Sequence, residues 1–127
     1  MTVVFDASAV LALVRGEPGD TRVANAMQSA VICAVNVAEV VERLRRDFAE
    51  ENVIASLGLV LPPTLAADRE LAVAAGLMRA ATRSAGLSTG DCFCLALGAR
   101  LQAKVLTADR KWAEIADQIG VQVQLIR

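Results

Sequence analysis

Four carboxylates stand where this sequence passes from an apolar run or a turn signal into a predicted helix, and together they could bind a cation. They are Asp6 after residues 2–5, Glu39 after 31–35, Asp91 after 88–90, and Asp109 after 105–107. If the apolar runs are parallel strands of one sheet, the acids share the edge at which open α/β sheets bind ligands. Carboxylates that converge must either take up protons or hold a cation.

The chemistry of these side chains favours a hard divalent cation. The chain contains no histidine, and its three cysteines form no CxxC pair. Oxygen ligands alone favour Mg²⁺ or Mn²⁺ over zinc. Two carboxylates ~4 Å apart repel by roughly 4 kcal/mol at an effective dielectric constant of ~20, whereas a helix cap contributes only ~1 kcal/mol. Convergence of the acids would therefore indicate a metal site, with Mg²⁺ (or Mn²⁺) as the cofactor.

Each acid also has an ordinary structural explanation. Asp6 could be the N-cap of the helix that follows it. Asn36 and Glu39 have the spacing of a capping box, with Asn36 as N-cap, and Glu39 could also pair with Arg43 one turn on. Asp91 would lie in the first turn of its helix, where the macrodipole favours a negative charge. Both explanations place the acids at helix N-termini beside the carboxyl edge of the sheet, so position alone does not separate them.

Hydroxyl groups accompany two of the acids. Ser8 follows Asp6 by two positions, and Thr107 precedes Asp109 by two, again at a strand end. Asp109 could also cap the helix that begins at Arg110. A hydroxyl at this spacing can hold a water molecule or a phosphate oxygen beside a bound cation.

The pattern of apolar residues predicts strands that alternate with helices. Strands are expected at residues 2–5, 30–35, 59–61, 104–107 and 121–126. Helices are expected at residues 8–14, 20–29, 36–48, 52–57, about 65–84, 88–100 and 110–118. This alternation indicates an α/β fold with a parallel sheet and right-handed βαβ connections. The helix at 36–48 is amphipathic, with one stripe that is either core or part of a partner surface: Val37, Val40, Val41, Leu44 and Phe48.

Length and composition limit the class of protein. A chain of 127 residues fits one domain, residues 1–127, with one core. Its longest apolar runs, such as residues 30–35, are far shorter than the ~20 residues that span a bilayer. The start lacks the pattern of a secretory signal, so we expect a cytoplasmic protein. The net charge of −1 does not indicate a nucleic-acid binder, because such domains are usually basic. The odd number of cysteines predicts reduced, buried thiols.

Four ordered segments resemble the PIN domain (the PilT N-terminal nuclease family), and within it the small VapC-type toxins of bacterial toxin–antitoxin pairs. The segments are Val4-Phe5-Asp6-Ala7-Ser8-Ala9 with Gly16-Glu17-Pro18-Gly19 behind it, Asn36-Val37-Ala38-Glu39-Val40, Leu87-Ser88-Thr89-Gly90-Asp91, and Leu106-Thr107-Ala108-Asp109. The resemblance covers essentially the whole chain. Two departures are Asn36, where the family often has Ser or Thr, and Cys92, where Ala is usual.

The resemblance implies a fold, a site and partners. It implies a five-stranded parallel sheet between helices, a homodimer, and a VapB-type antitoxin that blocks the acidic pocket. It places Asp6, Glu39, Asp91 and Asp109 at the metal-binding positions, with Ser8 and Thr107 at accessory hydroxyl positions. The implied activity is metal-dependent hydrolysis of RNA.

The residues themselves are consistent with that activity. Attack by the RNA 2′-hydroxyl normally requires a general base such as histidine, so metal-activated water is the consistent route, leaving a 5′-phosphate and a 3′-hydroxyl. Candidates for drawing phosphate to the rim are Arg110, Lys111, Arg79 and Arg83. The main alternative is a non-catalytic PIN-fold module that binds RNA or a partner. A receiver-like signalling domain fits less well, because Asp6 has no acidic neighbour.

Overall fold

A five-stranded parallel sheet forms the centre of the computed structural model, which describes residues 1–127. The strands are β1 (Val3–Phe5), β2 (Ala30–Cys33), β3 (Thr64–Leu65), β4 (Lys104–Thr107) and β5 (Val123–Leu125). Their order across the sheet is β3-β2-β1-β4-β5, and every neighbouring pair is parallel. The expected α/β sandwich is confirmed.

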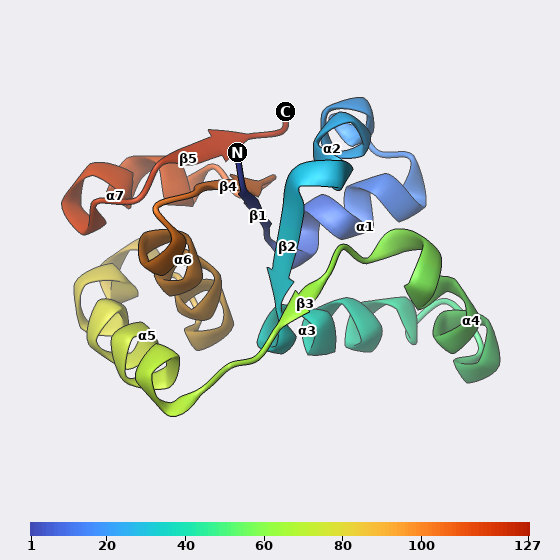
Figure 1. Ribbon diagram of the computed structural model, residues 1–127, viewed down its shortest axis with the longest axis horizontal. Coiled ribbons are helices and arrows are strands. Elements are labelled where there is room, and N and C mark those ends of the chain that lie inside the picture. Colours follow the sequence, from blue (N-terminus) through green and yellow to red (C-terminus); the bar gives the residue numbers. More distant parts are fainter.

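Helices cover both faces of the sheet (Figure 1). One face carries α1 (Ala7–Arg15), α2 (Asp20–Ala26), α3 (Ala34–Leu44) and α4 (Glu50–Val60). The other carries α5 (Arg69–Thr82), α6 (Thr89–Leu101) and α7 (Lys111–Ile119). Short 3₁₀ turns follow α2 at Met27–Ser29 and α5 at Arg83–Ala85.

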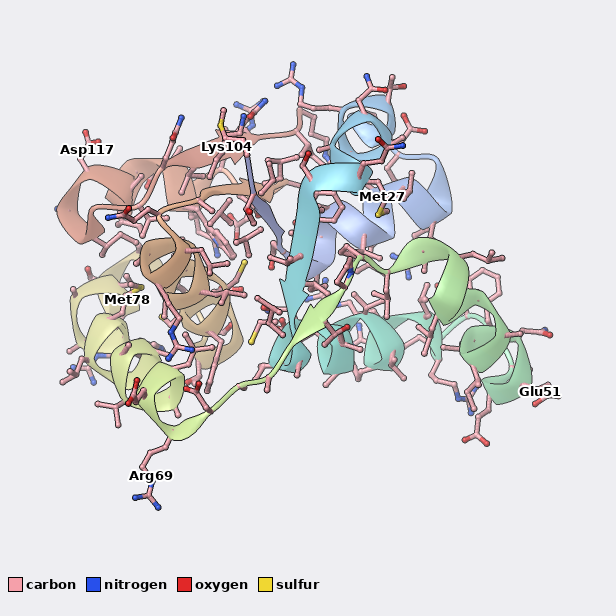
Figure 2. All side chains as sticks on the ribbon, viewed as in Figure 1. Met27, Glu51, Arg69, Met78, Lys104 and Asp117 are labelled. Atoms are coloured by element: carbon pink, nitrogen blue, oxygen red, sulfur yellow. The ribbon has the colours of Figure 1, made fainter.

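The two helical layers pack on opposite faces of the same strands, because successive strand residues alternate in direction. In β1, Val3 and Phe5 belong to the core under α1–α4, whereas Val4 belongs to the core under α5–α7. Charged side chains such as Glu51, Arg69 and Asp117 point away from the sheet (Figure 2). The apolar content of the sequence is therefore divided between two cores.

The strand register brings the carboxyl ends of three strands to one level. Phe5 pairs with Ile32 of β2 and with Leu106 of β4. The chain leaves β1 into α1, β2 into α3 and β4 toward α7 at this same edge. The register thus gathers the residues that follow each strand.

The structure differs from the expected elements in three places: at residues 59–61, at residue 48, and at residues 65–68, where a helix was expected but Leu65 belongs to β3 and α5 begins only at Arg69. Residues 59–61, expected as a strand, belong mainly to α4, and the third strand comes after Pro62 and Pro63. The carbonyl of Pro63 accepts a hydrogen bond from the backbone N–H of Ile32 at 3.0 Å, but neither proline has an N–H to donate, so the strand at this edge of the sheet is formed by the residues that follow them. Phe48, expected in the stripe of an α3 that reached residue 48, lies beyond the end of that helix and is 46% exposed.

The three cysteines are reduced and buried, as their number and spacing predicted. All three cysteines are free and buried, and burial raises the pKa of each thiol above its ordinary value. A raised pKa keeps a thiol protonated and unreactive. None of the helices has the length and apolar character that crossing a bilayer requires.

Candidate functional site

The four acids line one cavity at the carboxyl edge of the sheet. The cavity, of about 220 Å³, is lined by Asp6, Ala7, Ser8, Glu39, Arg43, Asp91, Ala108 and Asp109. Asp6 follows β1, Glu39 lies on α3, Asp91 on the first turn of α6, and Asp109 follows β4. The structure therefore brings together all four candidate acids, with Ser8 beside them.

Asp6 is held by the two hydroxyls that the sequence placed near it. Its Oδ2 accepts hydrogen bonds from Ser8 Oγ at 2.7 Å and from Thr107 Oγ1 at 2.9 Å. Each hydroxyl has one proton and gives it to Asp6, so the 3.2 Å approach of Ser8 Oγ to Thr107 Oγ1 joins two oxygens without a proton between them. Asp6 Oδ1 accepts no hydrogen bond. One oxygen of Asp6 is fixed and the other is free for a ligand.

The environment of Asp6 opposes its ionisation. The residue is 5% exposed, and its pKa is raised from 3.8 to about 6, chiefly by burial and then by the nearby charges of Asp91 and Glu39. The hydrogen bonds from Ser8 and Thr107 act in the opposite direction. A cation bound in the cavity would offset the cost of burial and the repulsion from the neighbouring acids, and would favour the ionised form of Asp6.

Glu39 is positioned by an amide, and not by the capping box that its spacing suggested. Helix α3 begins at Ala34 with Cys33 as N-cap, so Asn36 lies inside the helix and is fully buried. Its Nδ2 donates to Glu39 Oε1 at 2.7 Å. The N-cap prediction for Asn36 was wrong because the N-cap is Cys33, three residues earlier, so that α3 follows directly from the end of β2. The pKa of Glu39 is raised by partial burial, with Asp91 adding to the effect.

The structural roles expected of Asp6 and Asp91 are present, whereas Asp109 is not the N-cap of α7, which begins at Lys111 with Arg110 as its N-cap. Asp91 and Ser88 form a capping box at the start of α6, with Ser88 N donating to Asp91 Oδ2 at 2.9 Å. Asp109 Oδ1 accepts from the backbone N–H of Lys111 at 3.0 Å. Asp6 is the N-cap of α1. In Asp6 and Asp91 the helix cap uses one oxygen and leaves the second without a hydrogen bond.

The donor atoms fit a hard divalent cation, while their spacing limits how it can be held. All candidate ligands are carboxylate oxygens, and Asp6 Oδ1, Asp91 Oδ1 and Glu39 Oε2 accept no hydrogen bonds. No group of three or more acidic or thiol side chains in the structure is arranged to hold one metal ion together. Mg²⁺ commonly keeps several water ligands and binds one or two carboxylates directly. The site therefore fits an ion held partly through water, and direct ligation by all four acids stays a prediction.

One basic residue of the cavity was not among the expected rim candidates. Arg43 lies one helical turn after Glu39 and lines the cavity with the acids. It lowers the pKa of Glu39, against the stronger effect of burial. The i,i+4 spacing from Glu39 was the signal that could have placed it there. Of the expected candidates, Lys111 reaches to 3.9 Å from Asp109 Oδ2, whereas Arg79 has an enclosed guanidinium nitrogen.

The family of the chain follows from a model of the PIN domain, which matches residues 3–118. This chain belongs to the PIN domain family. No protein among the curated sequences is similar enough to count as a match.

Solved structures with the same fold come from several bacteria. DNA-bound VapBC from Salmonella typhimurium superposes with a TM-score of 0.77 at 16% identity, covering 100% of this chain and 99% of that one. VapBC-1 from nontypeable Haemophilus influenzae gives 0.74 at 17% identity, covering 99% and 98%. VapC20 from Mycobacterium tuberculosis, described as a toxin that cleaves the sarcin–ricin loop, gives 0.72 at 11% identity, covering 89% and 94%. At these identities the matches show a shared fold.

Proposed function

We propose that this PIN-domain protein is a Mg²⁺- or Mn²⁺-dependent endoribonuclease, a VapC-type toxin neutralised by a VapB-type antitoxin. The observation that carries the proposal is the cavity at the carboxyl edge of the sheet, which is lined by four acids from separate segments and by one basic residue, Arg43. The solved structures that share the fold support it, because several are VapBC complexes and one is an RNA-cleaving toxin.

The residues of the cavity have separate roles in this proposal. Asp6 and Asp91 would hold the cation through the oxygens that accept no hydrogen bond, with Asp109 beside them. A bound divalent ion would lower the pKa of a coordinated water and offset negative charge on the scissile phosphate. Ser8 and Thr107 hold Asp6 in place, as their hydrogen bonds show.

Glu39 is the acid best placed to orient the attacking water. Its Oε1 is fixed by Asn36, while its Oε2 accepts no hydrogen bond. Arg43, on the same helix face, supplies a positive charge for a phosphate oxygen. Hydrolysis by water leaves a 5′-phosphate and a 3′-hydroxyl, and the absence of histidine is consistent with this route.

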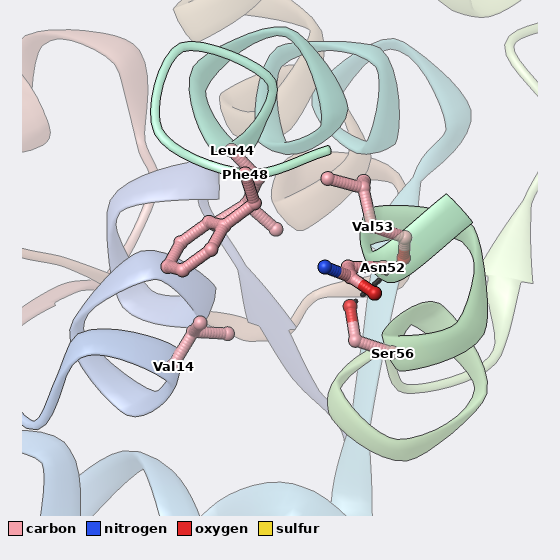
Figure 3. A pocket seen from close by; sticks show the side chains of 6 residues that line it. All are labelled: Val14, Leu44, Phe48, Asn52, Val53 and Ser56. Atoms are coloured by element: carbon pink, nitrogen blue, oxygen red, sulfur yellow. Dashed lines mark hydrogen bonds between the residues drawn. The ribbon is translucent and has the colours of Figure 1, made fainter. Parts of the chain in front are cut away.

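An apolar pocket lies at the C-terminal end of α3, away from the acidic cavity, and supports an antitoxin as a partner. The pocket, of about 140 Å³, is lined by Val14, Leu44, Phe48, Asn52, Val53 and Ser56 (Figure 3). Phe48 lines this pocket and is partly exposed to solvent. Ile54 and Leu59 of α4 are also exposed. An apolar segment of an antitoxin is the partner that such a surface fits.

The outer face of α5 supports a homodimer. After the charged Arg69 and Glu70 of its first turn, the exposed residues of α5 are all small or apolar: Ala72, Val73, Ala74, Gly76, Leu77, Ala80 and Ala81. Val73 is 56% exposed and Leu77 is 72% exposed. Contact between the α5 helices of two copies would bury this face. We further propose that residues 1–127 act as one domain in the cytoplasm, where the RNA substrate is found.

Cleavage of RNA by the purified protein tests the proposal. We expect cleavage with Mg²⁺ or Mn²⁺, none with EDTA, and products that carry a 5′-phosphate. Asp6→Asn should reduce the rate by more than about 100-fold, because even residues that only support a metal ligand are worth about 10- to 100-fold. Asp117→Asn, an exposed change on α7, is the matched control. Cleavage that is indifferent to EDTA or to Asp6→Asn would contradict the proposal.

A non-catalytic module is the second candidate, and one observation favours it. Asp6, Asp91 and Asp109 each have a completed structural role at a helix start, and no three acids are arranged to hold an ion together. In that case wild-type protein and Asp6→Asn would bind RNA equally and neither would cleave it. The same assay therefore separates the two candidates.

A further inference from the structure

The amide of Asn36 joins two helices at the edge of the acidic cavity. Its Nδ2 donates both to Glu39 Oε1 at 2.7 Å and to the backbone oxygen of Gly90 at 3.1 Å. Both partners accept hydrogen bonds and cannot donate them, so the amide can satisfy them only with its NH₂ group. The side chain of Asn36 is thereby locked between α3 and the first turn of α6.

Gly90 supplies the surface against which the Glu39 carboxylate rests. A Cβ added at Gly90 would lie 2.6 Å from Glu39 Oε2 and 2.9 Å from its Cδ. These distances are too short for real atoms, so any side chain at position 90 would push the carboxylate away. The carboxylate is the end of a flexible side chain and would move at little cost in stability, but it would leave its position beside the cavity.

This arrangement leaves one polar atom without a partner. Asn36 Oδ1 is buried and accepts no hydrogen bond. An unsatisfied buried acceptor is unfavourable, so this end of the amide lowers the stability of the folded protein. The two hydrogen bonds that Asn36 donates, to Glu39 and to Gly90, offset this cost.

We propose that Asn36 and Gly90 are positioning residues that together hold the Glu39 carboxylate toward the acidic cavity. The proposal rests on the proposed metal-dependent function of that cavity. Asn36 fixes Oε1 from the α3 side, and Gly90 provides the space that Oε2 occupies on the α6 side. Neither residue would contact the substrate or the reacting atoms.

A positioning role and a purely structural role predict opposite relations between stability and function. Alanine favours a helix more than glycine does, and Gly90 lies in α6. Gly90→Ala should therefore leave the thermal midpoint unchanged or raise it. We expect the same variant to weaken Mn²⁺ binding and RNA cleavage by about 10- to 100-fold, the range seen when a ligand loses its support.

Asn36 variants provide an independent test. Asn36→Leu removes both donor bonds and also the unpartnered acceptor, so the thermal midpoint should fall little while Mn²⁺ affinity falls by about 10-fold or more. Asn36→Ser keeps a hydroxyl donor in the helix and should restore part of the affinity that Asn36→Leu loses. Gly58→Ala is the matched control, because its added Cβ meets no atom within 4 Å.

A double-mutant cycle shows whether these residues act through Glu39. Mn²⁺ affinity, measured by calorimetry on the metal-free protein, should fall in Gly90→Ala but be no lower in Glu39→Ala/Gly90→Ala than in Glu39→Ala alone. A loss of the same size in both backgrounds would overturn the inference, as would Gly90→Ala binding Mn²⁺ like wild type. Wild-type protein that binds no Mn²⁺, or Asp6→Asn that binds it equally well, would instead overturn the proposed function on which the inference rests.

Discussion

Thr107 Oγ1 donates a hydrogen bond of 2.9 Å to Oδ2 of Asp6, joining two residues that are 101 positions apart in the chain. Thr107 is the last residue of β4, and Asp6 directly follows β1. The same hydroxyl accepts from the backbone N–H of Asp109 at 3.1 Å. One side chain therefore fixes the position of two of the acids that line the cavity.

Replacing this hydroxyl should weaken metal binding in a pH-dependent way. Thr107→Val keeps the shape of the side chain but removes a hydrogen bond that lowers the pKa of Asp6. The pKa of Asp6 should rise further, so that a cation must displace a proton over a wider pH range. In Mn²⁺ titrations, the deficit in affinity of Thr107→Val relative to wild type should shrink as the pH rises from 6 to 8. Thr64→Val, an exposed change in β3, should show no deficit, and a deficit that is constant with pH would contradict this role.

The metal-free protein should lose stability as the pH rises through the pKa of Asp6. The pKa of this carboxyl is 3.8 in the reference state and about 6 in the folded protein, so the folded state binds the proton more tightly. The stabilisation is complete below pH ~4 and is lost as the pH rises through 6, amounting to roughly 3 kcal/mol. The raised pKa of Glu39 acts in the same direction. Urea unfolding in EDTA between pH 4.5 and pH 7.5 measures the slope.

Asp6→Asn is the control for this slope. The variant should be less dependent on pH over the same range and more stable than wild type at pH 7.5, because it removes a buried charge beside Asp91 and Glu39. Asp68, whose pKa the Arg100 guanidinium holds near 2, adds stability above pH 4 and loses it only on further acidification. The contribution of Asp68 to stability therefore does not change between pH 4.5 and pH 7.5. A wild-type stability that rose with pH between 4.5 and 7.5 would contradict the electrostatic account of the cavity.

Divalent cations should counteract the effect of pH on stability. A ligand that binds only the folded state stabilises it by about 2.7 kcal/mol at 100 times its dissociation constant. Because ionised carboxylates bind the cation, the increase in thermal midpoint with Mg²⁺ or Mn²⁺ should be larger at pH 7.5 than at pH 5.5. EDTA should abolish the increase, and Asp6→Asn should show little of it at either pH.

The sequence was sufficient to predict the fold and the gathering of the acids. Parallel strands end level with one another, so an acid placed directly after an apolar run is carried to a shared edge whatever the details of packing. Asp6 and Asp109 follow their strands within two residues, and Glu39 and Asp91 lie in the first two turns of the helices beside that edge. The hydroxyls of Ser8 and Thr107 could be associated with the acids for the same reason.

Features that depend on three-dimensional packing could not be predicted in this way. Asn36 donates a hydrogen bond to the backbone oxygen of Gly90, which is 54 residues away. The local sequence pattern instead predicted that Asn36 would be the N-cap of its own helix. The exposure of Phe48 depends on where α3 ends, which its apolar stripe does not show. The position of β3 after two prolines is set by pairing with Ile32 and Cys33 of β2, and not by its own short sequence.

Gly98 should be required for the packing of α6 on β4. A Cβ at this position would lie 2.5 Å from Cγ2 of Val105 and 3.3 Å from the backbone oxygen of Ala103. Overpacking a core by one methyl group typically costs 1–3 kcal/mol, so Gly98→Ala should destabilise the protein by about that amount. Gly58→Ala, with open space around it, should instead stabilise the protein by up to ~1 kcal/mol in urea unfolding. Equal effects of the two changes would contradict the close packing.

A charge on the outer face of α5 should dissociate the proposed homodimer. Leu77 is 72% exposed on this face, and Ile54 is 62% exposed on α4. A symmetric interface repeats each substitution on both copies, so Leu77→Lys places two like charges in one contact. We expect sedimentation of Leu77→Lys as a monomer at concentrations where wild type is a dimer. Ile54→Lys removes a comparable exposed apolar side chain and should remain dimeric, because α4 is not part of that face. Dissociation by Ile54→Lys and not by Leu77→Lys would move the interface to α4.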